Sequence, residues 1–131
     1  MDRRRLLSLA IVAAALPAVA RAAAEKKKAG GASYLPVPTL LGSTQRPDGR
    51  RGVLSVECGL DVPDAGLRAR AEASLPRLRS AYVMAVQAYA AGLPSGFPPD
   101  ADFIARTLQQ QTDAVLGRPG ARLLLGAILV N

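Results

Sequence analysis

The sequence predicts a single α+β domain, with a small antiparallel or mixed sheet of about three strands and two or three helices packed on one face, preceded by an N-terminal signal helix. Three observations predict this class. Two extended segments come first, the second with a period-two alternation of apolar residues. Segments with apolar residues every three or four positions follow. An apolar run of strand length comes last, so the order is two strands, helices and a strand.

Residues 1–22 have the order of a secretory signal peptide. A short basic region precedes an uncharged run of 15 residues, 6–20, and small residues at the spacing of a signal-peptidase site follow. As a helix that run would span roughly 22 Å, which is less than a hydrocarbon core of about 30 Å. We expect cleavage near Ala22 or Ala24, with Ala20 and Ala22 in the cleavage region.

The basic start also fits a twin-arginine export signal, with Arg3 and Arg4 followed by Leu6 and Leu7. Signals of the general secretory route begin with arginine clusters too, and an uncleaved anchor helix is a third reading. All three place residues 34–131 beyond the inner membrane. We therefore expect a periplasmic protein, soluble if the signal is cleaved and anchored in the inner membrane if it is not.

The net charge belongs mostly to the N-terminus. The whole chain carries +7, but residues 1–33 hold seven basic and two acidic side chains. Within them, residues 23–33 form a basic, Gly-rich linker. Residues 34–131 hold ten arginines and eight acids, a balance of only +2. A basic face for a nucleic-acid backbone is not implied, and no nucleic-acid partner is expected.

The exported domain begins with two segments that are expected to form a β-hairpin. Residues 35–41 alternate apolar side chains with two prolines, which confine that strand to an edge of the sheet or let it join only after the second proline. A Pro-Asp-Gly turn occupies residues 46–50. Residues 54–62 then place apolar side chains on one face. Cys58 lies on that face and is expected in the core, the alternative being a reactive or intermolecular thiol.

Helical segments follow the hairpin. Asp64 is placed to cap the first. Pro76 either kinks that helix or lies in the first turn of a second helix, with Ser74 as its cap. An apolar stripe then continues through residues 75–89, including two tyrosines that are expected to pack in the core.

The last helix is expected to begin at the cap Asp100 and to stop at Gly117. Three glutamines, residues 109–111, are expected on its solvated face. Residues 123–130 are apolar on both faces. Such a run predicts a strand covered on both sides, or an inner strand of the sheet.

No catalytic signature occurs in the sequence. It has no His and a single Cys, which removes the commonest general base and any cysteine cluster for a metal. Phosphate-binding glycine loops and the nucleophile elbow are also absent. Two acid pairs, Asp61 with Asp64 and Asp100 with Asp102, are expected to serve as turn and cap residues rather than as acid and base. We predict no catalytic, cofactor or metal site, and not an enzyme.

The densest basic group is formed by Arg68, Arg70, Arg77 and Arg79, with Glu72 among them. Their spacing does not make one continuous helical stripe, so a solvated face is favoured over a track for phosphates or RNA. This group is the candidate interaction surface for a protein partner.

Taken together, these segments resemble the periplasmic domain of the flagellar basal-body-associated FliL family. The resemblance rests on Tyr-Leu-Pro-Val-Pro at 34–38, Arg-Gly-Val-Leu-Ser-Val at 51–56, Leu-Pro-Arg-Leu-Arg at 75–79 and the run 123–130. It implies a stomatin-like α+β module, held by one N-terminal helix beside the stator units of the flagellar motor, that binds proteins and has no enzymatic activity. The run 6–20 is shorter than the membrane helix of that family.

The sequence thus predicts a periplasmic, non-enzymatic interaction or scaffold module. Self-association, a protein partner or an inner-membrane complex would occupy its surface, with no cofactor and no metal. The alternative is a periplasmic carrier that holds a small apolar ligand between the sheet and the helices.

Overall fold

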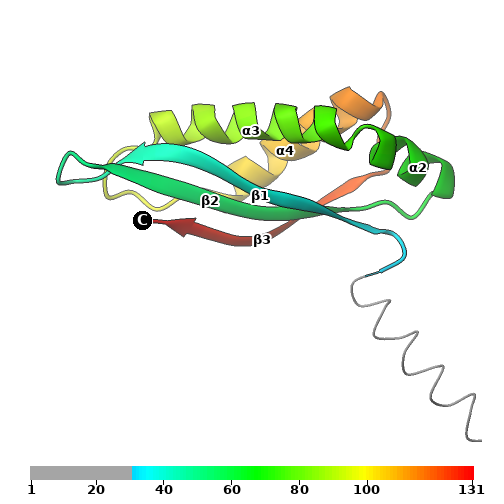
Figure 1. Cartoon of the computed structure of the whole chain (residues 1–131), viewed down its shortest axis with the longest axis horizontal. Helices are drawn as coiled ribbons and strands as arrows, with labels where there is room; N and C mark the ends of the chain where they lie inside the picture. Colours follow the sequence, from blue (N-terminus) through cyan, green and yellow to red (C-terminus); the bar gives the residue numbers. More distant parts are fainter. Residues whose placement is uncertain (1–30) are drawn as a thin grey trace, which may run out of the picture. The chain divides into compact units, whose positions relative to one another are not determined.

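The two extended segments pair as the predicted hairpin (Figure 1). In the computed structural model, which describes residues 31–131, strand β1 (Tyr34–Gln45) runs antiparallel to strand β2 (Arg51–Asp61). Ser33–Asn131 form one compact unit. The residues predicted for the export signal and its cleavage lie outside the described part of the chain: Arg3, Arg4, Leu6, Leu7, Ala20 and Ala22.

The turn of the hairpin has the predicted chemistry. The Gly49 N–H donates to the Arg46 carbonyl at 2.9 Å, and Gly49 has a φ of 82°. This left-handed conformation favours glycine because no Cβ is present to clash.

A bulge in β1 corrects the predicted faces of that strand. The register shifts between Val37 and Leu40, so one extra residue enters β1 in the stretch that contains Pro38 and Thr39. Leu40 is therefore fully buried, whereas Leu41 points away from the core and is 54% exposed. The sequence pattern had placed Leu41 on the same face as Leu35 and Val37.

Three antiparallel strands form the sheet in the order β1-β2-β3, with β2 in the centre. Helices α3 (Leu75–Gly92) and α4 (Ala101–Leu116) cover one face, with α3 over β1 and α4 over β3 (Figure 1). The predicted α+β class is confirmed. The two prolines of β1 lie on an edge strand, as their missing N–H groups require.

The segment around Pro76 forms two helices rather than one kinked helix, which is the second of the two predicted arrangements. Helix α2 (Ala65–Ala73) ends, and α3 begins with Pro76 in its first turn. Ser74 is the residue between them, but its side chain makes no cap hydrogen bond. Pro76 lacks the N–H that an interior helical position would need, so the break falls there.

The core lies between the sheet and the helices. The inward side chains of β2 are buried, including Cys58, whose pKa burial raises to about 11. On α3 the buried stripe is Leu78, Tyr82, Val86 and Ala90. The hydroxyl of the fully buried Tyr82 forms a hydrogen bond with Thr112 of α4, and burial raises the pKa of Tyr82 to about 12.

Strand β3 (Arg122–Val130) overturns one prediction. It is an edge strand paired only with β2, and not an inner strand or one covered on both faces. Its inward residues meet the helices, but Leu124 and Leu129 are exposed on the opposite face. A strand that is apolar on both faces favours burial of both faces. In the described part of the chain, the helices cover only one of them.

Candidate functional site

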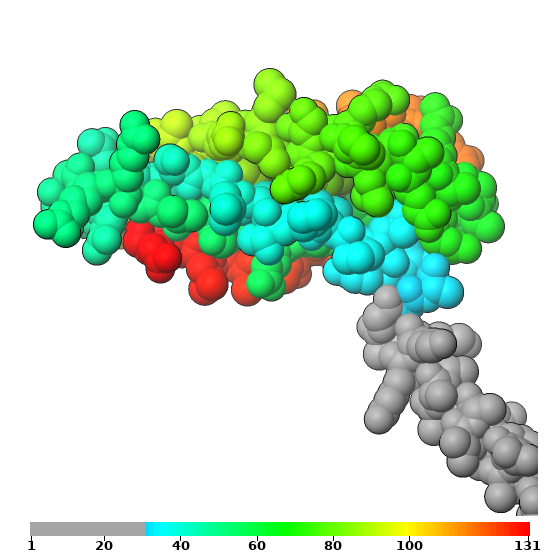
Figure 2. All heavy atoms as spheres, viewed as in Figure 1, coloured from blue at the N-terminus to red at the C-terminus, as the bar shows by residue number. Residues whose placement is uncertain are grey.

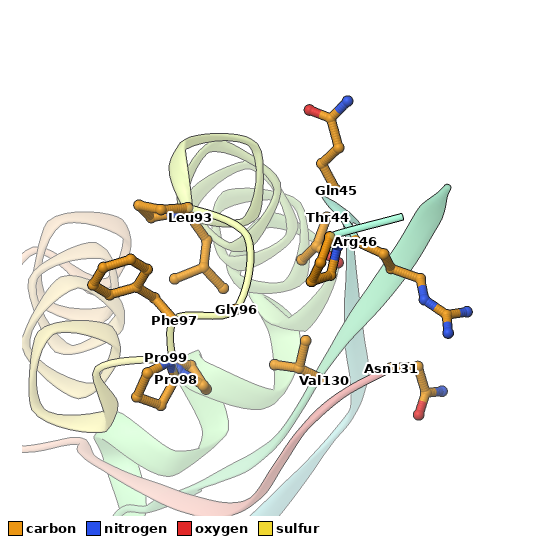
Figure 3. A pocket seen from close by; sticks show the side chains of 12 residues that line it. Thr44, Gln45, Arg46, Leu93, Gly96, Phe97, Pro98, Pro99, Val130 and Asn131 are labelled. Atoms are coloured by element: carbon orange, nitrogen blue, oxygen red, sulfur yellow. The ribbon is translucent and has the colours of Figure 1, made fainter. Parts of the chain in front are cut away.

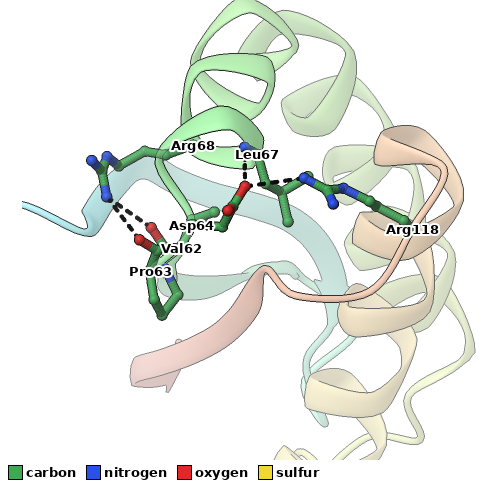
Figure 4. Close-up of polar contacts among 6 residues, drawn as sticks. All are labelled: Val62, Pro63, Asp64, Leu67, Arg68 and Arg118. Carbon is green, nitrogen blue, oxygen red and sulfur yellow. Dashed lines mark hydrogen bonds and ion pairs between the residues drawn. The ribbon is translucent and has the colours of Figure 1, made fainter.

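Two of the four arginines of the predicted interaction surface are bound to carbonyls near the ends of other elements. The Arg68 Nη1 donates to the Val62 carbonyl at 3.1 Å (Figure 4). The Arg77 Nη2 donates to the Val115 carbonyl at 3.5 Å, in the last turn of α4. Because the last carbonyls of a helix lack intrahelical partners and carry partial negative charge, Arg77 stabilises that helix end.

The other two arginines are exposed and have different neighbours. Arg70 lies beside the end of α4, where a Cβ added to Gly117 would lie 3.7 Å from its Nη2. Arg79 borders a shallow hollow on α3 together with Val83 and Met84. The structure therefore does not present the four guanidinium groups as one free basic patch.

Asp64 has a structural role near these arginines. Its carboxylate accepts a hydrogen bond from the Leu67 N–H at 2.7 Å and one from Arg118 Nη2 at 3.1 Å (Figure 4). The backbone hydrogen bond, then the Arg118 charge, hold the pKa of Asp64 below its usual value. The ion pair is exposed, so it adds little stability. Asp64 is a helix cap, as predicted, that also contacts the loop after α4.

Two of the three remaining predicted acids also have structural partners, and the third, Asp102, lies in the first turn of α4. Asp100 accepts from the Phe103 N–H at 3.1 Å as the cap of α4, and Asp61 accepts from the Ser33 hydroxyl at 2.7 Å. Among residues 31–131, no group of three acidic, His or Cys side chains is placed to hold a metal ion. No helix of this described part is long and apolar enough to span a membrane.

The uncovered face of the sheet carries four exposed apolar side chains, Leu41, Val53, Leu124 and Leu129, which we call the sheet face. Leu129 is 61% exposed. Leu41 pairs with Ser55 of β2, and Ser55 pairs with Leu129 of β3, so the two leucines flank one serine across all three strands. An antiparallel sheet covered on one side ordinarily alternates apolar and polar residues, with the polar ones outward. The sheet face departs from that rule on each strand.

The free edge of β3 adjoins the sheet face. Figure 2 shows β3 (red) forming the border of the domain opposite the helices. At the start of β3, the side chain of Gln109 takes the place of a neighbouring strand. The Gln109 Oε1 accepts from the Leu123 N–H and the Gln109 Nε2 donates to the Ala121 carbonyl, both at 2.8 Å. Gln109 is thus half-buried, and its predicted place on a solvated face is wrong.

A cleft of about 330 Å³ lies at the end of the sheet, between the strand ends and the loop of residues 93–99 (Figure 3). Leu93, Phe97 and Val130 line it, together with Arg46. Thr44 also belongs to this lining; its hydroxyl oxygen is buried from solvent and has no hydrogen-bond partner in the described structure. The cleft combines an apolar wall with one cation.

An aromatic pair lies on the other side of that loop. The rings of Tyr89 and Phe103 stack with centroids 5.5 Å apart, and the Tyr89 hydroxyl accepts from the Asp100 N–H at 2.7 Å. Both rings line an open groove between α3 and α4. Tyr89 thus fastens the start of α4 to α3.

No model of a known protein family matches the chain, and no curated protein matches it.

Sequence reasoning missed the sheet face, although two signals for it were present. The adjacent leucines Leu40 and Leu41 cannot both point inward in a regular strand, so one had to be exposed. The run 123–130 had more apolar side chains than one buried face can use.

Proposed function

We propose that residues 34–131 form an exported, non-enzymatic interaction module that works through the sheet face. The observation that carries the proposal is the exposure of Leu41, Val53, Leu124 and Leu129 on the uncovered side of the sheet. Leu41, Val53 and Leu129 are cross-strand neighbours there, and Leu124 lies farther along β3, beyond Glu57. Single exposed apolar residues are common on protein surfaces, but a contiguous group on a regular element is typical of a binding surface.

The energetics favour burial of this face by a partner. Fully burying a leucine is worth about 1.5 to 3 kcal/mol relative to leaving it exposed. Leu41 and Leu129 keep more than half of their surface in water. Acid and base chemistry has no comparable support, because Asp64 and Asp100 are occupied as helix caps.

Export and membrane association belong to the same proposal and rest on the N-terminal sequence and on the resemblance to the FliL family. The signal of residues 1–22 would deliver the domain to the periplasm. An inner-membrane complex such as the flagellar motor is then the proposed location, on the strength of that resemblance alone.

Fractionation tests the export. An antibody against the domain should detect a processed species in the periplasmic fraction, and replacing Arg3 and Arg4 together by lysine should block processing if the twin-arginine route is used. Detection by an antibody makes a C-terminal tag unnecessary, and such a tag would lie next to β3. An unprocessed cytoplasmic protein would contradict the proposal.

Native gel electrophoresis of the extracted protein tests the surface. The double variant Leu41→Ser, Leu129→Ser should migrate as a smaller species than the wild type. Met84→Ser is the matched control, since Met84 is 69% exposed on α3, on the helical side of the domain. A wild type that migrates as the free chain, and does not differ from the double variant, would contradict the interaction module.

The cleft is the basis for a carrier as a second candidate function, with the ligand at the end of the sheet rather than between the sheet and the helices. Its volume of about 330 Å³ and its apolar lining would suit a small ligand. The fluorescent probe 8-anilinonaphthalene-1-sulfonate, an apolar anion, should bind the wild type and bind Phe97→Ala more weakly. Leu129→Ser controls for binding at the sheet face. Equal binding by the wild type and Phe97→Ala would count against a ligand site.

A further inference from the structure

The two edges of the sheet differ in how well they are protected against pairing. β1 carries Pro36 and Pro38 and a bulge, three features that block a further strand. β3 has nine residues, no proline and a single charged residue, Arg122. A long apolar edge of this kind is a template for another strand.

The backbone of β3 shows which groups are free. The Asn131 N–H donates to the Val53 carbonyl, so the backbone groups of residue 131 point toward β2. Because backbone groups alternate in direction along a strand, the N–H and C=O groups of Val130 and Ile128 point to the free edge. β3 has a bulge of its own, with one extra residue between Leu125 and Ile128, opposite the stretch between Val56 and Cys58. Leu123 and Leu125, on the other side of this bulge, also turn their backbone groups to the free edge. In the described chain only Leu123 has its N–H satisfied there, by Gln109.

We infer that a second copy of this chain pairs antiparallel with β3, about a twofold axis between Gly126 and Ala127. The inference rests on the proposed interaction module and names its partner. Two three-stranded sheets would join into one continuous sheet of six strands.

The bulge selects the register of this pairing. The edge-facing residues are Leu123, Leu125, Ile128 and Val130, which are unevenly spaced because two residues separate the middle pair. Only the register centred between Gly126 and Ala127 places all four opposite one another, Leu123 against Val130 and Leu125 against Ile128. Registers centred on Leu124 or on Leu129 also set edge-facing residues against each other, but each uses only two of the four and so gives a shorter ladder.

The same register joins the exposed leucines. Leu124 of one copy lies directly opposite Leu129 of the other, and these are the outward apolar residues of β3. Cross-strand apolar neighbours of this kind stabilise a sheet by about 0.2 to 1 kcal/mol per pair. The pairing therefore completes both the backbone of the edge and part of the sheet face.

The proposed contact joins two copies and does not continue into a fibre, because the edge of β1 cannot pair with a further strand. A pairing of β3 with β1 would repeat and give a fibre, but the prolines of β1 leave no continuous ladder there. An isologous β3–β3 contact uses one edge of each copy and stops at two.

Cysteine cross-linking tests the register in the full-length protein. Leu124→Cys and Leu129→Cys are prepared separately in a Cys58→Ala background and oxidised with copper phenanthroline. Mixed together they should give a disulfide dimer, because the two positions form a close, non-hydrogen-bonded pair across the axis. Each alone should not, since identical positions are far apart in this register. A mixture of Leu41→Cys with Leu124→Cys is the matched control and should give no disulfide-linked dimer.

Charge replacement tests the same contact without a cross-link. In sedimentation velocity, Leu124→Lys, Leu129→Lys should be a monomer, whereas Leu124→Glu, Leu129→Lys should regain the dimer because opposite charges face each other across the axis. Equal behaviour of the two double variants, or cross-linking of each cysteine variant with itself, overturns the proposed register. A monomeric wild type overturns the homodimer. If the extracted wild type still migrates above its Leu41→Ser, Leu129→Ser variant, the interaction module stands with a different partner.

Discussion

The Gln109 side-chain amide and the Leu123 backbone N–H join α4 to the first residues of β3 through a hydrogen bond of 2.8 Å. The same amide donates to the Ala121 carbonyl at 2.8 Å. A side chain thus supplies both the donor and the acceptor that a fourth strand would supply. Because Gln109 holds the Leu123 N–H, only the carbonyl of Leu123 is left to bond to Val130 of the proposed second copy.

Replacing Gln109 by leucine should lower the free energy of unfolding by about 1 to 3 kcal/mol, because the Leu123 N–H and the Ala121 carbonyl lose their partners in a half-buried place. Urea unfolding followed by circular dichroism measures the change. Gln110→Leu, one residue away and exposed, is the control and should stay within about 0.5 kcal/mol of the wild type. Equal stability of the two variants would show that the amide does not support β3.

Gly42→Ala should destabilise the domain by about 1 to 3 kcal/mol through overpacking. An added Cβ would lie 2.7 Å from the Ala90 Cβ and 3.0 Å from the Val86 carbonyl oxygen, where α3 packs on β1. Thermal unfolding measures the loss, and Ala90→Gly in the same protein should restore part of it. Gly92→Ala has open space around the new Cβ and should not be harmful. A Gly42→Ala protein as stable as the wild type would show that the contact between α3 and β1 yields easily.

Stability should fall as the pH rises from about 9 to 12. Burial raises the pKa of Cys58 from 9.0 to about 11 and that of Tyr82 from 10.0 to about 12. Between these values the unfolded chain ionises while the folded chain holds its protons, so the unfolded state gains stability by at most about 1.4 kcal/mol per pH unit for each group. The contribution of each group is complete below its ordinary pKa and is lost as the pH rises through its raised one.

Urea midpoints measured from pH 8 upward test this dependence. Cys58→Ala should remove the loss that begins near pH 9, and Tyr82→Phe the one that begins near pH 10. Tyr89→Phe is the control, because the Tyr89 side chain is only partly buried. A pH profile unchanged by Tyr82→Phe would mean that this phenol does not govern alkaline unfolding.

Thr112→Val should cost about 1 to 3 kcal/mol of unfolding free energy, because it leaves the buried Tyr82 hydroxyl without its partner. The double variant Tyr82→Phe, Thr112→Val removes both polar groups and should lose less than the sum of the single variants. A double-mutant cycle by urea unfolding gives the coupling. Additive losses would argue that the two hydroxyls act independently.

The hairpin and the helix ends could be predicted from the sequence because their causes are local. The Pro-Asp-Gly turn, the caps Asp64 and Asp100 and the stop at Gly117 each depend on a few neighbouring residues, and the structure has all of them. The α+β class followed from the order of these elements.

The rest depended on contacts between distant segments. The alternation of β1 could not reveal the bulge before Leu40, which exchanges the two faces of the strand. The composition of β3 could not distinguish an inner strand from an exposed edge strand, since both are apolar when a partner covers them. Gln109 looked like a solvated glutamine because its partners lie on another element.

The buried Cys58 has a consequence for how the chain is handled if it is exported. At pH 7, a thiol with a pKa of about 11 is ionised in roughly one molecule in ten thousand, and the thiolate is the form that attacks disulfides. Once the helices have packed on the inner face of the sheet, the thiol is buried and stays protonated, which slows its attack on disulfides in an oxidising compartment. Before that, in the unfolded chain, it is an ordinary thiol. Oxidation of this cysteine would therefore occur during the maturation of the protein rather than during its working life.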